Sequence, residues 1–148
     1  GSYVHAKSVQ AQKDKIKGVY ILEMIGFFSE QPIQSYPVGL KWIYPSHGNF
    51  IATVSNVSSR DLGAGYCAAM QQLDQLECQR LVAPSFANAF DFSDHLNYWE
   101  FDIPAVMITD TAFYRNSHYH TKADRLATLN LTKMANVIDG LVQHLLKP

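Results

Sequence analysis

The sequence lacks an excess of charge of either sign. It contains 12 Lys and Arg residues against 13 Asp and Glu residues, which gives a formal net charge of -1 at pH 7 with neutral histidines. A chain so close to neutral has neither the basic field that attracts nucleic acid nor an acidic tail. We therefore expect no nucleic acid among its partners.

Long apolar runs are also absent. No stretch approaches the ~20 consecutive apolar residues that cross a bilayer, so the sequence predicts no membrane span. Secretory signals, internal repeats, low-complexity tracts and linkers are not found either. The 148 residues, 47% of them hydrophobic and 17% charged, instead have the composition of a folded chain with a real core. We predict one domain over residues 1–148.

Cysteine is scarce, with Cys67 and Cys78 as the two examples. If residues 65–74 are helical and the helix continues to Cys78, the two residues lie ~16 Å apart. This exceeds the ~7 Å limit between the Cα atoms of a disulfide. We therefore predict two free thiols, which mildly favours a reducing, cytoplasmic location.

The pattern of apolar residues predicts alternating strands and helices. Residues 19–25 form a near-continuous apolar run, typical of an interior strand of a parallel sheet, and 105–109 form another. This alternation predicts an α/β fold of three layers (αβα), with a predominantly parallel sheet and helices on both faces. The other expected strands are 49–54 and 77–82, and the expected helices are 3–13, 58 or 59 to 74, 93–101 with Ser93 as N-cap, and 134–145.

Polar and aromatic residues crowd the loop that follows the strand at 105–109. The loop begins at Asp110 and contains Arg115, several rings and two histidines. Ligands of open α/β sheets bind beyond the carboxyl ends of strands. A second feature is Glu23, a lone acid in the apolar run 19–25, which we expect to face a cation or a donor because an unpartnered buried carboxylate is costly. Together these features predict half of a metal site.

Four short motifs carry a resemblance to a known family. They resemble, in order, parts of the C-terminal half of the di-zinc aminopeptidases, a family that also includes glutaminyl cyclases and the transferrin receptor ectodomain. The similarity extends from about residue 15 to residue 146. The motifs are the segment 22–26 with Glu23, the triplet Ser93-Asp94-His95, the segment 103–111, and His118-Tyr119-His120-Thr121 followed by Asp124.

The resemblance implies a role for each matched residue. Glu23 corresponds to the acidic ligand of the second zinc, and His120 corresponds to a histidine ligand of the first. Tyr119 corresponds to a tyrosine that stabilises the tetrahedral oxyanion, as a phenol donor suits an oxyanion. Carboxylate and imidazole are ordinary zinc ligands. The residues expected to support the site without binding metal are Ser93, Asp94, His95 and Asp124.

The family's remaining ligands and its glutamate general base lie in an N-terminal half that this chain does not contain. Neither a His-x-Asp motif nor an adjacent Glu-Glu pair occurs here. We therefore expect an incomplete domain, resembling the C-terminal half of a zinc-peptidase catalytic domain. Zinc binding to this chain alone should be weak or absent, and the chain alone inactive. An unpaired strand edge should lead to self-association or to pairing with the missing N-terminal half.

The implied function of the intact parent is that of a zinc-dependent exopeptidase of the aminopeptidase type. It would hydrolyse the N-terminal bond of a peptide substrate through metal-activated water, with two zinc ions. A glutaminyl cyclase is a second possibility, although cyclases generally differ at the positions of Ser93 and Tyr119. A non-catalytic scaffold or binding domain on the same fold is a third, and the sequence upstream of Gly1 would separate it from an enzyme.

Overall fold

A mixed sheet of four strands forms the centre of the molecule in a computed structural model, which describes residues 1–37, 39–83 and 93–147. The strand order is β1-β4-β2-β3. The strands are β1 (Val19–Leu22), β2 (Phe50–Ser55), β3 (Glu77–Val82) and β4 (Ala105–Thr109), and the α-helices are α1 (Ser2–Val9), α2 (Arg60–Leu73), α3 (His95–Trp99) and α4 (Leu131–Leu145).

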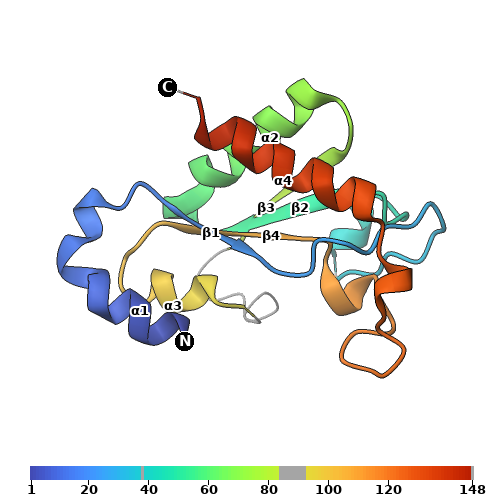
Figure 1. Cartoon of the computed structure of the whole chain (residues 1–148), viewed down its shortest axis with the longest axis horizontal. Coiled ribbons are helices and arrows are strands. Elements are labelled where there is room, and N and C mark those ends of the chain that lie inside the picture. The colour runs from blue at the N-terminus through green and yellow to red at the C-terminus, as the bar shows by residue number, and fades with distance from the viewer. Residues whose placement is uncertain (38, 84–92, 148) are drawn as a thin grey trace.

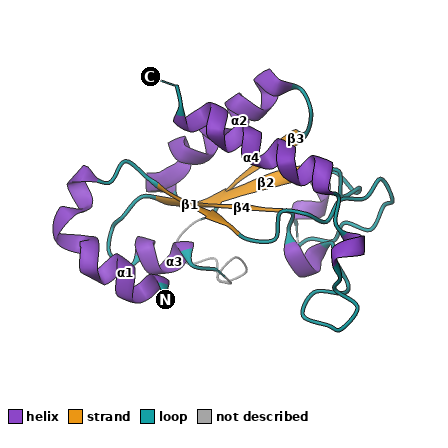
Figure 2. Ribbon diagram, in the orientation of Figure 1, coloured by secondary structure: helices purple, strands orange, loops and turns teal. Residues whose placement is uncertain are grey.

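Helices cover both faces of this sheet. Helices α2 and α4 pack together on one face, and α1 and α3 lie on the other (Figure 1, Figure 2). The prediction of a three-layer α/β fold is therefore confirmed. β1 pairs with β4 and β2 with β3 in parallel, while the central pair β2–β4 is antiparallel. As a result, the carboxyl ends of β1 and β4 lie at the same edge of the sheet as the amino ends of β2 and β3.

The core lies on both sides of the two central strands, in which every residue is buried. On the side of α2 and α4, Ile51 and Ile108 pack in one apolar cluster with helical residues such as Met70. On the other side, Ala105 packs with Tyr98 and other residues of α1, α3 and the segment before β4. The core thus fixes the register of β4, whose carboxyl end leads into the polar loop.

Strand β1 is shorter and more exposed than the sequence predicts. Residues 19–25 were expected to form a well-buried interior strand, but β1 ends at Leu22, and Met24 turns the chain with a φ of 52°. Its residues are half-buried, and Leu22 is 40% exposed. The predicted pairing with β4 is confirmed, whereas the deep burial is wrong, because β1 lies at the end of the described sheet and has one neighbour there.

The prediction of two free thiols is wrong. Cys67 and Cys78 form a disulfide, with their Cα atoms 5.3 Å apart. Helix α2 ends at Leu73, and Asp74 adopts a left-handed conformation that reverses the chain, so that β3 returns alongside the helix. The ~16 Å separation required a helix that continued to Cys78. The preference for a reducing compartment rested on two free thiols, so it no longer has support.

Most other element boundaries agree with the prediction to within a few residues, but the N-cap of α3 does not. The helix begins at His95 after Asp94, and Ser93 is one residue too early to cap it. The Ser93 hydroxyl donates instead to Glu23 (3.2 Å). None of the helices within the described residues is long and apolar enough to cross a membrane.

Candidate active site

Glu23 follows directly on β1, at the carboxyl edge of the sheet. Its backbone N–H donates to the carbonyl oxygen of Ile108 (3.0 Å), which extends the ladder between β1 and β4 by one residue. The carboxylate is half-buried and accepts the hydrogen bond from the Ser93 hydroxyl. The expectation that Glu23 faces a donor is therefore confirmed, and the donor is Ser93.

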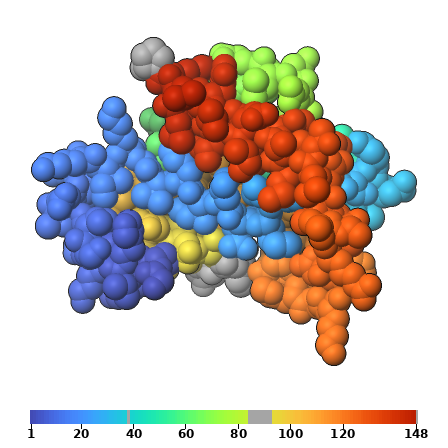
Figure 3. All heavy atoms as spheres, in the orientation of Figure 1, coloured from blue at the N-terminus to red at the C-terminus, as the bar shows by residue number. Residues whose placement is uncertain are grey.

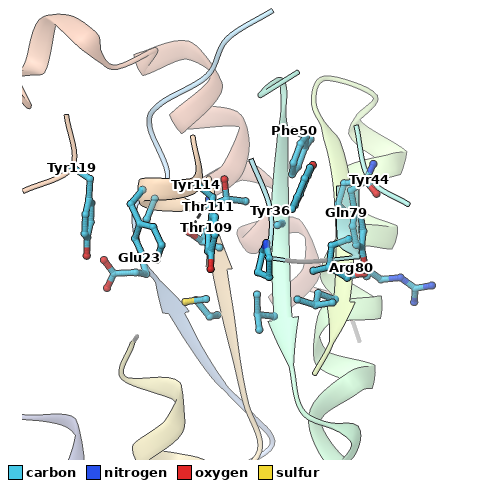
Figure 4. A pocket seen from close by; sticks show the side chains of 18 residues that line it. Glu23, Tyr36, Tyr44, Phe50, Gln79, Arg80, Thr109, Thr111, Tyr114 and Tyr119 are labelled. Atoms are coloured by element: carbon cyan, nitrogen blue, oxygen red, sulfur yellow. Dashed lines mark hydrogen bonds between the residues drawn. The ribbon is translucent and has the colours of Figure 1, made fainter. Parts of the chain in front are cut away.

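Tyr119 and His120 reach the same edge from the loop that follows β4. Their rings lie against each other with centroids 3.9 Å apart and an interplanar angle of 44°, and Tyr119 is half-buried while His120 is exposed. Burial raises the pKa of the Tyr119 phenol, and the negative charge of Glu23 raises it further, so the hydroxyl keeps its proton. Figure 4 shows this hydroxyl directed toward the Glu23 carboxylate. Two segments almost a hundred residues apart in the sequence thus meet at one place.

A mainly apolar hollow adjoins Glu23 and Tyr119, with about 790 Å³ of empty space that is partly open to solvent (Figure 4). Its floor is the face of β2, β3 and β4 on the side of α3, and its walls come from the loop before β2 and the loop after β4. The Arg80 guanidinium points away from it. The aromatic residues of the lining are Tyr36, Tyr44, Phe50, Phe113, Tyr114 and Tyr119.

The remaining residues named by the resemblance lie at varying depth. His95 is fully buried, with its ring edge against Trp99 (4.6 Å between centroids). Asp94 is exposed and accepts a hydrogen bond from the Ser2 hydroxyl (2.6 Å), which joins this segment to α1. Asp124 is exposed, and its backbone N–H donates to Thr121, so it contributes to the fold of the loop that carries His120.

Two buried charged residues lie next to this edge, and sequence reasoning gave them no role. Asp110 is fully buried and Arg115 is 3% exposed. Burial raises the pKa of Asp110 to about 6, although backbone N–H groups and the charge of Arg115 act in the opposite direction. Burial also lowers the pKa of Arg115 to about 10, against the effect of Asp110. In the sequence, the one pattern that could have indicated a role for Asp110 is its position immediately after the buried strand 105–109.

The donors present match zinc in kind but not in number. Glu23 offers a carboxylate and His120 an imidazole, both of which zinc accepts. Within residues 1–37, 39–83 and 93–147, however, no group of three or more His, Cys, Asp or Glu side chains is placed to hold a metal ion. A full zinc site at this edge therefore needs donors from outside the described residues.

Comparison with known proteins gives consistent matches along almost the whole chain. The model of peptidase family M28 matches residues 1–145. An uncharacterized Escherichia coli K12 protein, YfbL, is 44% identical over 144 residues, which is 96% of this chain and 44% of YfbL. The chain thus spans less than half the length of this relative.

Solved structures of aminopeptidases share the fold. The Legionella pneumophila LapA aminopeptidase superposes with a TM-score of 0.66 at 21% identity, covering 97% of this chain and 34% of LapA. An aminopeptidase from Aneurinibacillus sp. strain AM-1 gives 0.62 at 19% identity, covering 98% of this chain and 29% of that enzyme. At these identities the likeness concerns the fold.

Proposed function

Because the chain belongs to peptidase family M28, we propose that the full-length protein is a zinc-dependent aminopeptidase and that this chain supplies part of its active site. The relatives of known structure are aminopeptidases of the same fold. The observation that carries the proposal is the meeting of Glu23 with the Tyr119–His120 loop beside an apolar hollow. Carboxylate and imidazole are ordinary zinc ligands, and a protonated phenol is a suitable donor to the oxyanion of peptide hydrolysis.

Each of these groups has a distinct task in the proposed reaction. Zinc, when bound, lowers the pKa of water and polarises the scissile carbonyl. Glu23 presents a carboxylate that the Ser93 hydroxyl orients, and His120 presents an imidazole from the opposite loop. The Tyr119 phenol, whose pKa is raised by burial and by Glu23, would donate to the oxyanion. The apolar hollow would exclude water from one side of the substrate.

The remaining metal donors and the general base would come from the rest of the full-length protein. The described part of this chain offers too few donors for a zinc site. We therefore expect the isolated 148-residue chain to bind zinc weakly and to be inactive. Calorimetric titration with zinc, and release of a chromogenic amine from amino-acid anilides, measure both properties. Tight stoichiometric binding with turnover would mean that the ligands are misassigned.

The decisive experiment uses the full-length protein. Wild type is expected to contain zinc and to release the chromogenic amine, and Glu23→Gln is expected to lose both properties. Glu30→Gln, a change of the same kind at an exposed acid nearby, is the matched control and should retain both. Cyclisation of glutaminyl peptides without hydrolysis would favour a glutaminyl cyclase. Neither activity, in a protein without zinc, would favour the non-catalytic scaffold.

The free edge of β1 is the place where the rest of the sheet would join. The N–H of Val19 donates to Pro104, just before β4, and that of Glu23 donates to Ile108 in β4. The alternation of a parallel ladder therefore directs the backbone N–H and C=O groups of Tyr20 and Leu22 away from β4. Figure 3 shows the blue atoms that follow α1 as a surface band below α4. This edge would pair with a strand from the rest of the full-length protein, or with a second copy when the chain is alone. Light scattering of the isolated chain across a concentration series tests it, and a monodisperse monomer at high concentration would contradict it.

A further inference from the structure

The buried Asp110 carboxylate holds together two loops that are far apart in the sequence. Its Oδ2 accepts hydrogen bonds from the backbone N–H groups of Gly26 (3.0 Å) and Phe27 (2.7 Å), in the loop after β1. Its Oδ1 accepts from the N–H of Ala112 (3.0 Å), in the loop after β4. The Asp110 N–H also donates to the carbonyl of Met24 (2.6 Å), the residue that follows Glu23.

Arg115 makes a second set of bonds from the loop after β4. Its Nη1 donates to the carbonyl oxygens of Phe27 (3.2 Å) and Phe50 (2.9 Å), and its Nε donates to the Gln34 side chain (2.7 Å). The Gln34 amide in turn donates to the Thr111 hydroxyl (2.9 Å). A lysine has no planar fork with which to reach three acceptors in these fixed directions.

Backbone strain gathers in the same two loops. Six non-glycine residues among the described ones have positive φ, and four of them lie here: Met24, Thr111, Ala112 and His120. Such a conformation is strained for a residue other than glycine and persists only where its surroundings hold it. Three of the four take part in the hydrogen bonds described above. Met24 and Ala112 are bonded to Asp110, and Thr111 is bonded to Gln34, the partner of Arg115. The network therefore fixes the backbone on either side of the candidate site.

We infer that Asp110 and Arg115 are positioning residues, which set the distance and direction between Glu23 on one loop and Tyr119–His120 on the other. This inference rests on the proposed function, because its consequence is the geometry of a metal site. Within the described part of the chain, the hydrogen bonds of the two side chains go to Gly26, Phe27, Ala112, Gln34 and Phe50 and not to a proposed ligand. They act through the backbone that carries those ligands.

The test measures zinc affinity in the full-length protein by competition with a chelator. Asp110→Asn places an amide N–H against at least one backbone N–H, and Arg115→Lys keeps the charge but removes the fork. Each is expected to weaken zinc binding 10- to 100-fold, as for other changes behind a metal ligand. Tyr66→Phe is the matched control, because Tyr66 is also fully buried and also donates to a backbone carbonyl, that of Val137 (3.1 Å), between α2 and α4. It should lower the melting temperature and leave zinc affinity unchanged.

Amide exchange of the zinc-free protein gives a readout that does not depend on metal. In Asp110→Asn, the amides of Gly26, Phe27 and Ala112 should lose protection, while those of α2 and α4 keep it. If Asp110→Asn does not fold, Gln34→Ala at the half-buried rim of the network replaces it, with a severalfold loss of affinity expected.

The outcomes separate the inference from the proposed function. If wild type binds zinc and the folded variants bind it within twofold of wild type, the positioning role is wrong and the proposed function stands. If wild type binds no zinc, the proposed function is wrong, and the positioning role, which depends on it, is wrong too. If Tyr66→Phe weakens zinc binding as much as Arg115→Lys, the effect is one of general stability and the inference is overturned.

Discussion

Two regions of this chain are held in place by different interactions, a disulfide in one and hydrogen bonds of buried charged side chains in the other. The turn between α2 and β3 is closed by the Cys67–Cys78 disulfide, and the loops after β1 and β4 are joined by buried Asp110 and Arg115. A disulfide limits how far two segments can separate, without directing the backbone N–H and C=O groups around it. A charged network directs these groups individually. We therefore expect the first region to serve stability and the second to serve the geometry of the proposed site.

The largest expected effect is on activity at the second region. In the full-length protein, His120→Ala removes a proposed zinc ligand, so kcat/KM should fall by more than the roughly 100-fold typical of changes behind a ligand. His118→Ala, two residues earlier in the same loop and equally exposed, is the control and should stay near wild type. Anilide hydrolysis and zinc content measure both. Equal losses in the two variants would mean that the loop, and not one imidazole, is required.

Removing the disulfide is expected to lower stability without lowering activity. Replacing Cys67 and Cys78 together by alanine should lower the free energy of unfolding by about 2–4 kcal/mol, since the bond closes a loop with a sequence separation of 11 residues. Zinc affinity and kcat should not change, because neither cysteine lines the hollow beside Glu23. Urea unfolding with and without a reducing agent measures the effect. A parallel loss of zinc binding would show that the two regions are coupled.

These two regions also differ in how far the sequence revealed them. The carboxyl edge was predictable, because a lone acid in an apolar run and a polar loop after a buried strand are both local patterns. In the structure, Glu23 and Tyr119 line the same hollow at this edge, and their roles stay a prediction. The disulfide was missed because it depends on one backbone conformation, that of Asp74, which decides whether the helix continues or reverses.

The roles of Asp110 and Arg115 were hidden for a different reason. Most of their partners are backbone atoms, and those of Gly26, Phe27 and Phe50 lie more than sixty residues away along the chain. A side chain that binds backbone atoms leaves no residue-type pattern at the other end of the contact. The strands and helices were predictable from apolar periodicity, but the antiparallel pairing of β2 with β4 follows from connections that this periodicity does not encode.

A smaller effect should appear in the pH dependence of stability. Asp110 has its pKa raised by burial to about 6 from an ordinary value of 3.8. Between these values the folded chain holds a proton that the unfolded chain has lost, so Asp110's contribution to stability is present below about pH 4 and is lost as the pH rises through 6. The contribution is at most ~3 kcal/mol. Relative to Asp110→Asn, wild type should therefore gain stability as the pH falls from 7 to 4, measured by urea unfolding. Parallel curves for the two proteins would contradict the shift.

The smallest effect is expected when a residue with positive φ is replaced by glycine, at Asp74 in the first region or at Met24 in the second. Asp74, exposed and at a φ of 49°, closes helix α2 with a hydrogen bond from its N–H to Met70. Glycine avoids the roughly 1–2 kcal/mol that this conformation costs another residue, but it increases the entropy of the unfolded chain by an amount worth roughly 0.5–1 kcal/mol. Asp74→Gly should therefore raise the free energy of unfolding by at most about 1 kcal/mol and leave zinc affinity unchanged. Met24→Gly relieves a similar strain at a φ of 52°, but it frees the backbone next to Glu23. It should therefore weaken zinc binding whatever it does to stability. If both glycine variants left zinc affinity unchanged, the loop after β1 would be held by its network alone, and the conformation of Met24 would have no part in placing Glu23.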